Sequence, residues 1–264
     1  MSFLSDILEV KKEEIKRLKA NRTRSSFNNE EFFAAPVMSL KKALGKSDRI
    51  GIISEIKKAS PSKGILKHDF NHIKLAEIYF KCRTDAVSVL TDNYFFQGDI
   101  KFIYDIAKMK ESPILRKDFI IDEWQVLEAK AYGADAILLI AEALTTLQIN
   151  ELSYAAAECG LEVLLELHSE SELSKINFQL NDLIGINNRN LETFNVDLNT
   201  TINLSDKFPD NIIKTSESGF LTKEDINKVK ETNVNAVLVG EYFMKSHNIE
   251  SDFKTLKEWC SYAG

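Results

Sequence analysis

The chain has 264 residues, a length that suits one barrel-sized domain better than two small ones. Apolar residues make up 44% of it and charged residues 28%, which is ordinary for a globular protein. The net charge is −6, from 34 basic and 40 acidic residues. Because proteins that bind nucleic acid or anionic membranes carry an excess of Lys and Arg, this balance argues against both kinds of partner.

The cysteines indicate a reducing compartment. Cys82, Cys159 and Cys260 lie far apart, and an odd number without CxxC spacing argues against a disulfide framework and against a zinc site. Residues 1–20 are charged throughout and lack the apolar run of a signal peptide. No apolar run approaches the roughly 20 residues that a membrane span needs. We therefore expect a cytoplasmic protein.

The first 48 residues predict a helical extension. Within 2–18, Leu4, Ile7, Ile15 and Leu18 recur at helical spacing, with Lys and Glu between them. Residues 22–35 are polar and are expected to form a loop, and residues 39–44 a second, short helix.

From residue 49 onward, short runs rich in Ile, Val and Leu alternate with longer amphipathic stretches. The expected strands are 50–56, 86–90, 114–117, 136–141, 161–167, 183–187, 212–216 and 236–239, and the clearest helices are 73–82, 124–132, 147–159 and 225–231. Eight such units predict a closed (β/α)₈ TIM barrel over 49–264, within a single domain that spans 1–264. An open doubly wound sheet is the alternative, but KKASPSKG after Glu55 lacks its GxGxxG turn.

Polar side chains stand where most of these strands end, which is where barrels of this kind carry their active sites. Strand by strand, the residues at these ends include Glu55, Lys57, Ser60, Lys117, Glu166, Asn187, Arg189, Glu217, Ser218 and Glu241, together with Gly219 and Gly240. A carboxylate in an apolar strand is costly to desolvate unless it is paired. One such Glu alone would favour a structural ion pair inside the barrel mouth, but two Lys and three Glu on one rim favour a site.

The mixture of charges indicates acid–base chemistry on an anionic molecule. Lys57, Lys117 and Arg189 can hold anionic groups, and a partly desolvated lysine near other cations has a lowered pKa and can act as a general acid. Glu166 or Glu55 can be the complementary base. There is no HExxH and no cluster with metal-ligand spacing, so we expect neither a metal nor another cofactor.

The last two strands predict a phosphate site. Ser218-Gly219 and Gly240 place small residues at neighbouring strand ends, and 241–244 could begin a short helix there. Loops in these positions form the recurrent phosphate site of such barrels. Each glycine alone would only indicate a tight turn, but the pair favours a phosphorylated small molecule as the partner.

Six segments resemble the signatures of indole-3-glycerol-phosphate synthases, in that family's order and spacing. They are EIKKASPSKG at 55–64, LRKDF at 115–119, LELH at 165–168, INNRNL at 186–191, SESG at 216–219 and VGE at 239–241. The helical extension is also similar, so the resemblance covers nearly the whole chain. It implies conversion of 1-(2-carboxyphenylamino)-1-deoxyribulose 5-phosphate to indole-3-glycerol phosphate in tryptophan biosynthesis, with release of CO₂ and water.

The resemblance also implies roles for single residues. Lys117 would be the general acid at the substrate carbonyl, and Glu166 a base or the partner of the developing iminium charge. Glu55 and Lys57 would assist the dehydration or position the substrate. Which Lys–Glu pair performs which proton transfer stays open.

The remaining implied roles concern binding. Asn187 and Arg189 would orient hydroxyl and anionic groups, Glu217 would order the network, and Ser218, Gly219 and Gly240 would receive the phosphate. Phe119 and Leu191 would form walls for the aromatic ring, and Ser60, Leu238 and Glu241 complete the substrate contacts. Tyr242 stands where the family often has a small Ser, so backbone amides are expected to hold the phosphate.

Two other readings compete with a synthase. One is another phosphate-binding barrel enzyme, such as phosphoribosylanthranilate isomerase or an aldolase. The isomerase would commonly need a Cys and an Asp at strand ends, whereas Cys82 and Cys159 fall in predicted helices, and the aldolase would need a Schiff-base lysine. A non-catalytic binding barrel would be expected to lack some of Lys57, Lys117, Glu55 and Glu166, and all four are present. His168 should face the same side as Glu166 and is interpreted as a satisfied polar residue. Whether the chain is a monomer or a homodimer stays open.

Overall fold

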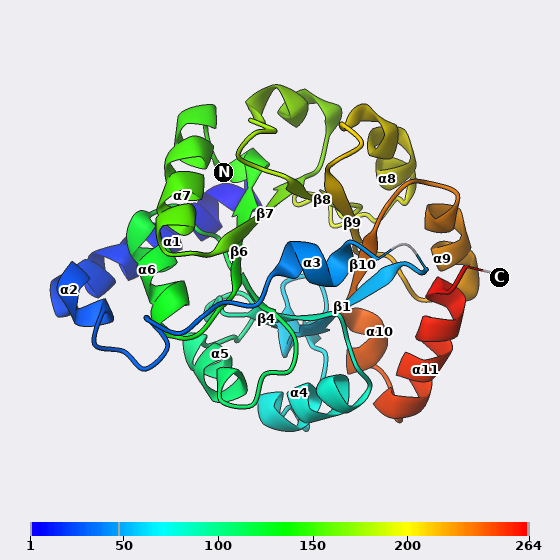
Figure 1. The fold of residues 1–264 in the computed structure, drawn as a ribbon, viewed down its shortest axis with the longest axis horizontal. Coiled ribbons are helices and arrows are strands. Elements are labelled where there is room, and N and C mark those ends of the chain that lie inside the picture. Colours follow the sequence, from blue (N-terminus) through cyan, green and yellow to red (C-terminus); the bar gives the residue numbers. More distant parts are fainter. Residues whose placement is uncertain (1, 47, 263–264) are drawn as a thin grey trace.

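The computed structural model describes residues 2–46 and 48–262. Parallel strands close into a barrel in the order β1-β10-β9-β8-β7-β6-β5-β4, with helices around it (Figure 1). The strands are β1 (Gly51–Ile56), β4 (Ala86–Leu90), β5 (Ile114–Lys117), β6 (Ala136–Ile140), β7 (Glu162–Leu167), β8 (Leu183–Asn187), β9 (Ile213–Glu217) and β10 (Ala236–Val239). The closed barrel confirms the predicted fold class and excludes the open doubly wound sheet.

The helices that follow the strands are α4 (His72–Lys81), α5 (Ile100–Ala107), α6 (Glu123–Ala131), α7 (Thr146–Glu158), α8 (Asn199–Leu204), α9 (Lys223–Lys230), α10 (Glu241–Met244) and α11 (Ile249–Cys260). Of these, α4, α6, α7 and α9 match the four clearest expected helices to within two residues at either end, and α10 is the expected short helix. Three 3₁₀ turns, η1 (Ala141–Ala143), η2 (Glu170–Lys175) and η3 (Ser205–Lys207), complete the connections. The long loop after β1 also contains a small hairpin of β2 (Ala59–Ser60) and β3 (Gly64–Ile65), which was not predicted.

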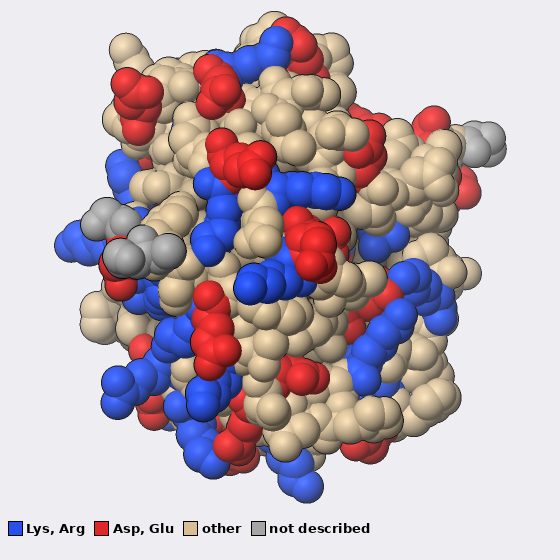
Figure 2. Space-filling model, turned by 90° about the vertical axis from the view of Figure 1, so that its right-hand side faces the viewer, with Lys and Arg blue, Asp and Glu red and all other residues tan. Residues whose placement is uncertain are grey.

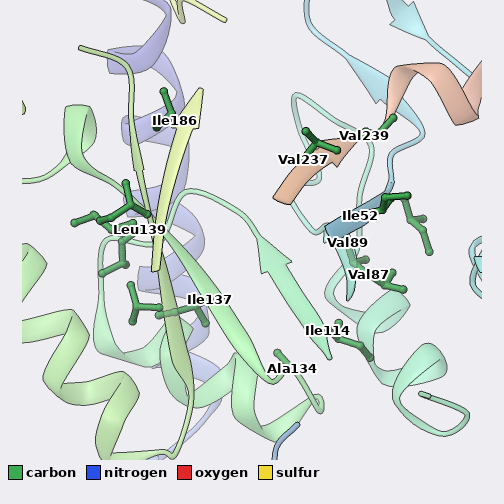
Figure 3. Close-up of a cluster of buried hydrophobic side chains, with 14 of the residues drawn as sticks. Ile52, Val87, Val89, Ile114, Ala134, Ile137, Leu139, Ile186, Val237 and Val239 are labelled. Atoms are coloured by element: carbon green, nitrogen blue, oxygen red, sulfur yellow. The ribbon is translucent and has the colours of Figure 1, made fainter. Parts of the chain in front are cut away.

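Side chains along each strand alternate between two apolar layers. Ile52, Val87 and Ile137 belong to the cluster between the strands and the outer helices (Figure 3). Their neighbours Ile53 and Leu138 belong to the cluster inside the barrel. Because successive side chains of a strand point to opposite faces, a polar residue in the inward row near a strand's end points into the barrel mouth.

The N-terminal extension contacts both ends of the barrel. Its first helix, α1 (Phe3–Asn21), reaches the C-terminal ends of the strands, where the Lys11 ammonium lies 2.8 Å from Asp92 and 2.9 Å from Asp118. Its last helix, α3 (Leu40–Leu44), covers the opposite end (Figure 1). There the hydroxyl of Ser39 donates to the carboxylate of Glu162, the first residue of β7.

The expectation of a loop over 22–35 was wrong in part. A one-turn helix, α2 (Arg24–Phe27), lies within it, beside α6 (Figure 1). Phe27 is fully buried, and its ring packs edge-on against Trp124, with centroids 5.8 Å apart. Four residues are too few for helical periodicity to show in a sequence, so this anchor could be recognised only from its tertiary contacts.

The surface carries both signs of charge. On the face seen from the right-hand side of Figure 1, Lys and Arg lie interspersed with Asp and Glu (Figure 2). Among the described residues, no helix is long and apolar enough to cross a membrane.

Candidate active site

A cavity of about 550 Å³ opens at the C-terminal ends of the barrel strands. All the residues that the sequence singled out for catalysis or substrate binding line it. They are Glu55, Lys57, Ser60, Lys117, Phe119, Glu166, Asn187, Arg189, Leu191, Glu217, Ser218, Gly219, Leu238, Gly240 and Glu241. The barrel thus brings together positions that are spread over nearly 190 residues of the chain.

Strand register explains this convergence. Lys117, Asn187 and Glu217 are the last residues of β5, β8 and β9, and Glu166 is the penultimate residue of β7. Across neighbouring strands, Asn187 is in register with Glu217, and Glu166 with Gly185. Since parallel strands end on the same side, their inward-facing polar residues form one ring around the mouth.

Lys117 lies at the centre of this ring. Its Nζ is 2.8 Å from Glu166 Oε2 and 2.9 Å from Glu217 Oε2, and its side chain is 14% exposed. Burial alone would lower the pKa of Lys117, but the negative charges of Glu166, Glu217 and Glu55 outweigh burial and hold this pKa well above its ordinary value. The expectation of a lowered lysine pKa is therefore wrong for the substrate-free protein, because carboxylates rather than cations surround the ammonium.

The two carboxylates beside Lys117 titrate very differently. Burial raises the pKa of Glu217 to about 8, and the charge of Glu166 adds to this rise against the opposing effect of Lys117. Burial also acts to raise the pKa of Glu166, but Lys117 and His168 hold it well below its ordinary value. Two buried carboxylates that share one ammonium cannot both ionise easily, and these opposite shifts favour protonation of Glu217 before Glu166.

A second Lys–Glu pair comes from β1 and the residue that follows it. Lys57 forms an ion pair with Glu55, whose side chain is 3% exposed. The backbone oxygen of Glu55 accepts a hydrogen bond from the Tyr79 hydroxyl, at 3.3 Å. A Cβ atom at position 240 would overlap the Glu55 carboxylate, so Gly240 provides the space that this side chain occupies.

Positively charged side chains surround Glu241, which lies just after the end of β10. Its carboxylate contacts the ammonium groups of Lys63 and Lys245, and Arg189 lies 3.8 Å away. Although partial burial opposes the shift, the two lysines lower the pKa of Glu241 to about 2. Three cations around one carboxylate leave a net positive charge, which suits a bound anion.

The backbone beside this charge cluster turns sharply. Ser218 and Gly219 have φ angles of 68° and 97°, in the left-handed region. At Gly219 a side chain would also collide with Val196. A tight turn of this kind can expose backbone N–H groups to a shared concavity, where they could hold an anion.

Apolar side chains form the remaining walls, and several were not predicted. Phe119, Leu191 and Leu238 line the cavity as expected, but so do Phe3 and Phe194, whose ring centroids are 5.2 Å apart. The position of Phe3 depends on how α1 lies against the mouth. No local pattern in the sequence carries that information, so no signal pointed to this residue.

Among the described residues, one group could offer ligand atoms to a metal ion: Glu142, His168 and Glu172, with atoms within 4.8 Å of one another. The Glu172 oxygens already accept from the His168 backbone N–H and the Ser169 hydroxyl. The imidazole of His168 also faces Glu166. Pairing between a histidine and carboxylates accounts for this group without an ion.

Comparison with known sequences identifies relatives over nearly the whole chain. A sequence model described as "Indole-3-glycerol phosphate synthase" matches residues 4–256. A protein of that name from Thermoanaerobacter pseudethanolicus is 46% identical over 242 residues, which are 92% of each chain. Another, from Nautilia profundicola, is 48% identical over 206 residues, 78% of this chain and 80% of the relative.

Solved structures share the barrel at much lower identity. The 3-hexulose-6-phosphate synthase of Salmonella typhimurium superimposes with a TM-score of 0.62 at 12% identity, over 80% of this chain and 98% of that one. Tryptophan synthase subunit alpha of Legionella pneumophila gives a TM-score of 0.57 at 14% identity, over 85% and 94% of the two chains. These likenesses show the fold alone.

Proposed function

The chain belongs to the indole-3-glycerol phosphate synthase family, and we propose that the cavity at its barrel mouth closes the indole ring of that product. It is thus a carboxy-lyase of tryptophan biosynthesis. The proposed substrate is 1-(2-carboxyphenylamino)-1-deoxyribulose 5-phosphate. The observation that carries the proposal is Lys117, held between Glu166 and Glu217 inside a cavity of about 550 Å³ that also has cations at its rim.

Ring closure joins the carboxyl-bearing ring carbon to the carbonyl carbon of the sugar chain. As that bond forms, the carbonyl oxygen needs a proton, and the Lys117 ammonium would donate it from the centre of the cavity mouth. A carbonyl oxygen that replaces one of its carboxylate contacts weakens the stabilisation of the ammonium and so makes Lys117 a stronger acid. Glu166 stays anionic and stabilises the positive charge that develops on the substrate nitrogen. Loss of CO₂ then restores the aromatic ring.

Dehydration follows and needs an acid for the departing hydroxyl and a base for a proton. Lys57 and Glu55 form a ready pair of that kind on the β1 side of the cavity. Glu217 keeps Lys117 in place, and Asn187, next to it in register, can hold a substrate hydroxyl. The two pairs allow the two chemical stages to use separate groups.

The rest of the cavity would bind the substrate. Ser218, Gly219, Gly240 and the start of α10 would hold the phosphate through backbone amides, and the cations around Glu241 would supply charge. Tyr242 packs against Trp259 instead of lining the cavity, which supports a backbone-held phosphate. The aromatic ring would lie between the walls formed by Phe119, Leu191 and Leu238, near Ser60.

The chain's setting is also part of the proposal. Three free cysteines support a reducing compartment, the cytoplasm. Because α1 contributes Phe3 to the cavity, the extension and the barrel would form one domain over 1–264. The substrate is the only partner the site requires, and a monomer or a homodimer would serve equally.

The direct test is to incubate the purified protein with the carboxyphenylamino-deoxyribulose phosphate, without added metal, and to follow indole fluorescence. We expect product to accumulate with release of CO₂. An absence of product would contradict the proposal. The competing isomerase reading loses support from the cavity, because none of the cysteines is among the described residues that line it. A lysine adduct trapped by borohydride with substrate would instead indicate an aldolase.

A further inference from the structure

Glu166 has a basic neighbour besides Lys117. His168 follows it by two residues, so both side chains leave the strand on the same side. The Nε2 atom of His168 lies 3.3 Å from Glu166 Oε1, while Lys117 contacts Oε2. The His168 side chain is 6% exposed, and it is not among the described residues that line the cavity. It therefore contacts the Glu166 carboxylate from outside the cavity that would hold the substrate.

The other ring nitrogen of His168 also faces a carboxylate. Its Nδ1 atom lies 3.5 Å from an oxygen of Glu142, which belongs to η1. Glu172 of η2 accepts a hydrogen bond from the His168 backbone N–H, at 3.1 Å. The charged groups around the imidazole are therefore Glu166, Glu142 and Glu172, with Lys117 on the far side of Glu166.

A charged imidazole explains this arrangement better than a neutral one. Both ring nitrogens lie at ion-pair distance from a carboxylate, 3.3 Å and 3.5 Å, although neither has the alignment of a hydrogen bond with a described residue. A neutral imidazole would turn an acceptor lone pair toward one of the two carboxylates, whereas an imidazolium offers an N–H to both. Burial acts to lower the pKa of His168, but Glu166, Glu172 and Glu142 raise it above its ordinary value.

We propose that His168 is a positioning residue for the synthase reaction: as an imidazolium between Glu142 and Glu166, it fixes Glu166 Oε1 and keeps that carboxylate anionic while Lys117 holds Oε2. This inference rests on the proposed function, which gives Glu166 its part in the reaction. The consequence is the location of the shared proton. With a cation on each side of Glu166, the proton stays on Glu217, and Glu166 is ready to stabilise positive charge.

The first test is the pH dependence of His168→Gln. Glutamine can still donate one hydrogen bond to Glu166 but carries no charge, so the pKa of Glu166 should rise. We expect the acid-side midpoint of the kcat profile to move up by about one pH unit or more, with about a tenfold loss of kcat below the new midpoint and a change in KM of less than about threefold. A profile with the midpoint of the unaltered enzyme, or a rise in KM alone, would overturn the proposal.

Glu142→Gln provides a second variant, outside the cavity and on a side chain that is 34% exposed. It removes the outer carboxylate that stabilises the imidazolium, so the acid-side midpoint should move in the same direction by a smaller amount. The matched control is Glu170→Gln, a neighbouring glutamate of η2 that is 64% exposed and pairs with Lys207. Its profile should be unchanged, and equal shifts in both variants would count against the proposal.

A titration by NMR tests the charge of His168 without any catalysis. Protein labelled with ¹⁵N-histidine should show an imidazole signal that is charged at pH 7 and is missing from His168→Gln. A neutral His168 at pH 7 would overturn the inference even in a fully active enzyme. A charged His168 in a protein that makes no indole product would instead contradict the proposed function, so the two failures are distinguishable.

Discussion

Gly185 provides space for a carboxylate at the centre of the site. It occupies an inward position on β8, and a Cβ atom there would overlap Oε1 of Glu217. In Gly185→Ala, the Glu217 carboxylate must move, and this displaces its contact with Lys117. Because a misplacement of about 1 Å can cost about 10²-fold in rate, we expect kcat to fall by about that factor.

The matched control is Gly51→Ala, at the opposite end of the barrel. A Cβ atom at position 51 would meet only ordinary contacts of 3.4 Å or more, so kcat should stay within about twofold of the unaltered enzyme. Steady-state kinetics of both variants decide the matter. Equal rates for the two would show that the position of Glu217 is unimportant.

The raised pKa of Glu217 predicts how the stability of the folded protein depends on pH. Its pKa is about 8 in the folded protein and near 4.5 in the unfolded chain, so the folded state binds this proton more tightly. The stabilisation that results is complete below pH 4.5 and is lost as the pH rises to 8. Glu217→Gln removes it, so the melting temperature of the unaltered protein minus that of the variant should fall between pH 5 and pH 8.

Thermal melts at several pH values measure that difference, which should change by several degrees, since about 1 kcal/mol shifts the midpoint by about 2–4 °C. Glu258→Gln, at an exposed position on α11, should give a constant difference. If the difference for Glu217→Gln is constant as well, the carboxyl group of Glu217 titrates near its ordinary value.

At the scale of elements, α1 is attached to the barrel mouth by a buried charge. Lys11 is 1% exposed and bridges Asp92 and Asp118, on the segments that follow β4 and β5. Lys11→Met removes the cation beside buried Asp92 and leaves Asp118 with Arg116 alone among the described residues, and the loss of one partner from a buried ion pair typically costs about 3–5 kcal/mol. We expect the free energy of unfolding from urea titration to fall by that amount.

Lys12→Met is the control on the same helix. Lys12 is 61% exposed and, among the described residues, pairs with Glu9 alone, so its loss should cost less than about 0.5 kcal/mol. A similar small effect for Lys11→Met would mean that the ion pairs at the mouth do not fasten α1.

The strands could be predicted closely, and α1's placement could not, for a physical reason. A buried parallel strand requires a short apolar run, and each expected run matches a strand to within one residue at either end. The amphipathic pattern of α1 likewise predicted a helix, but it does not say which surface its apolar side covers. The surface that α1 covers, and therefore the position of Phe3 in the cavity, depends on contacts with residues about 90 or more positions away.

For the whole molecule, the polar residues that meet in the cavity could be predicted, but their charge states could not. Polar residues at strand ends identify the members, because closure of the barrel brings all strand ends together. The charge state of Lys117 depends on which partners lie across the mouth, and these are Glu166 and Glu217, 49 and 100 residues away. Only the closed barrel reveals that carboxylates, and not cations, surround this lysine.

We propose that Lys117, between Glu166 and Glu217, delivers the proton for ring closure. The most direct measurement is kcat for Lys117→Met together with the equilibrium dissociation constant of the substrate. We predict a loss of kcat of at least about 10²–10⁴-fold with substrate binding retained, since the proposed phosphate and ring contacts involve other residues of the cavity. Turnover at the rate of the unaltered enzyme would contradict the role of Lys117 as the proton donor.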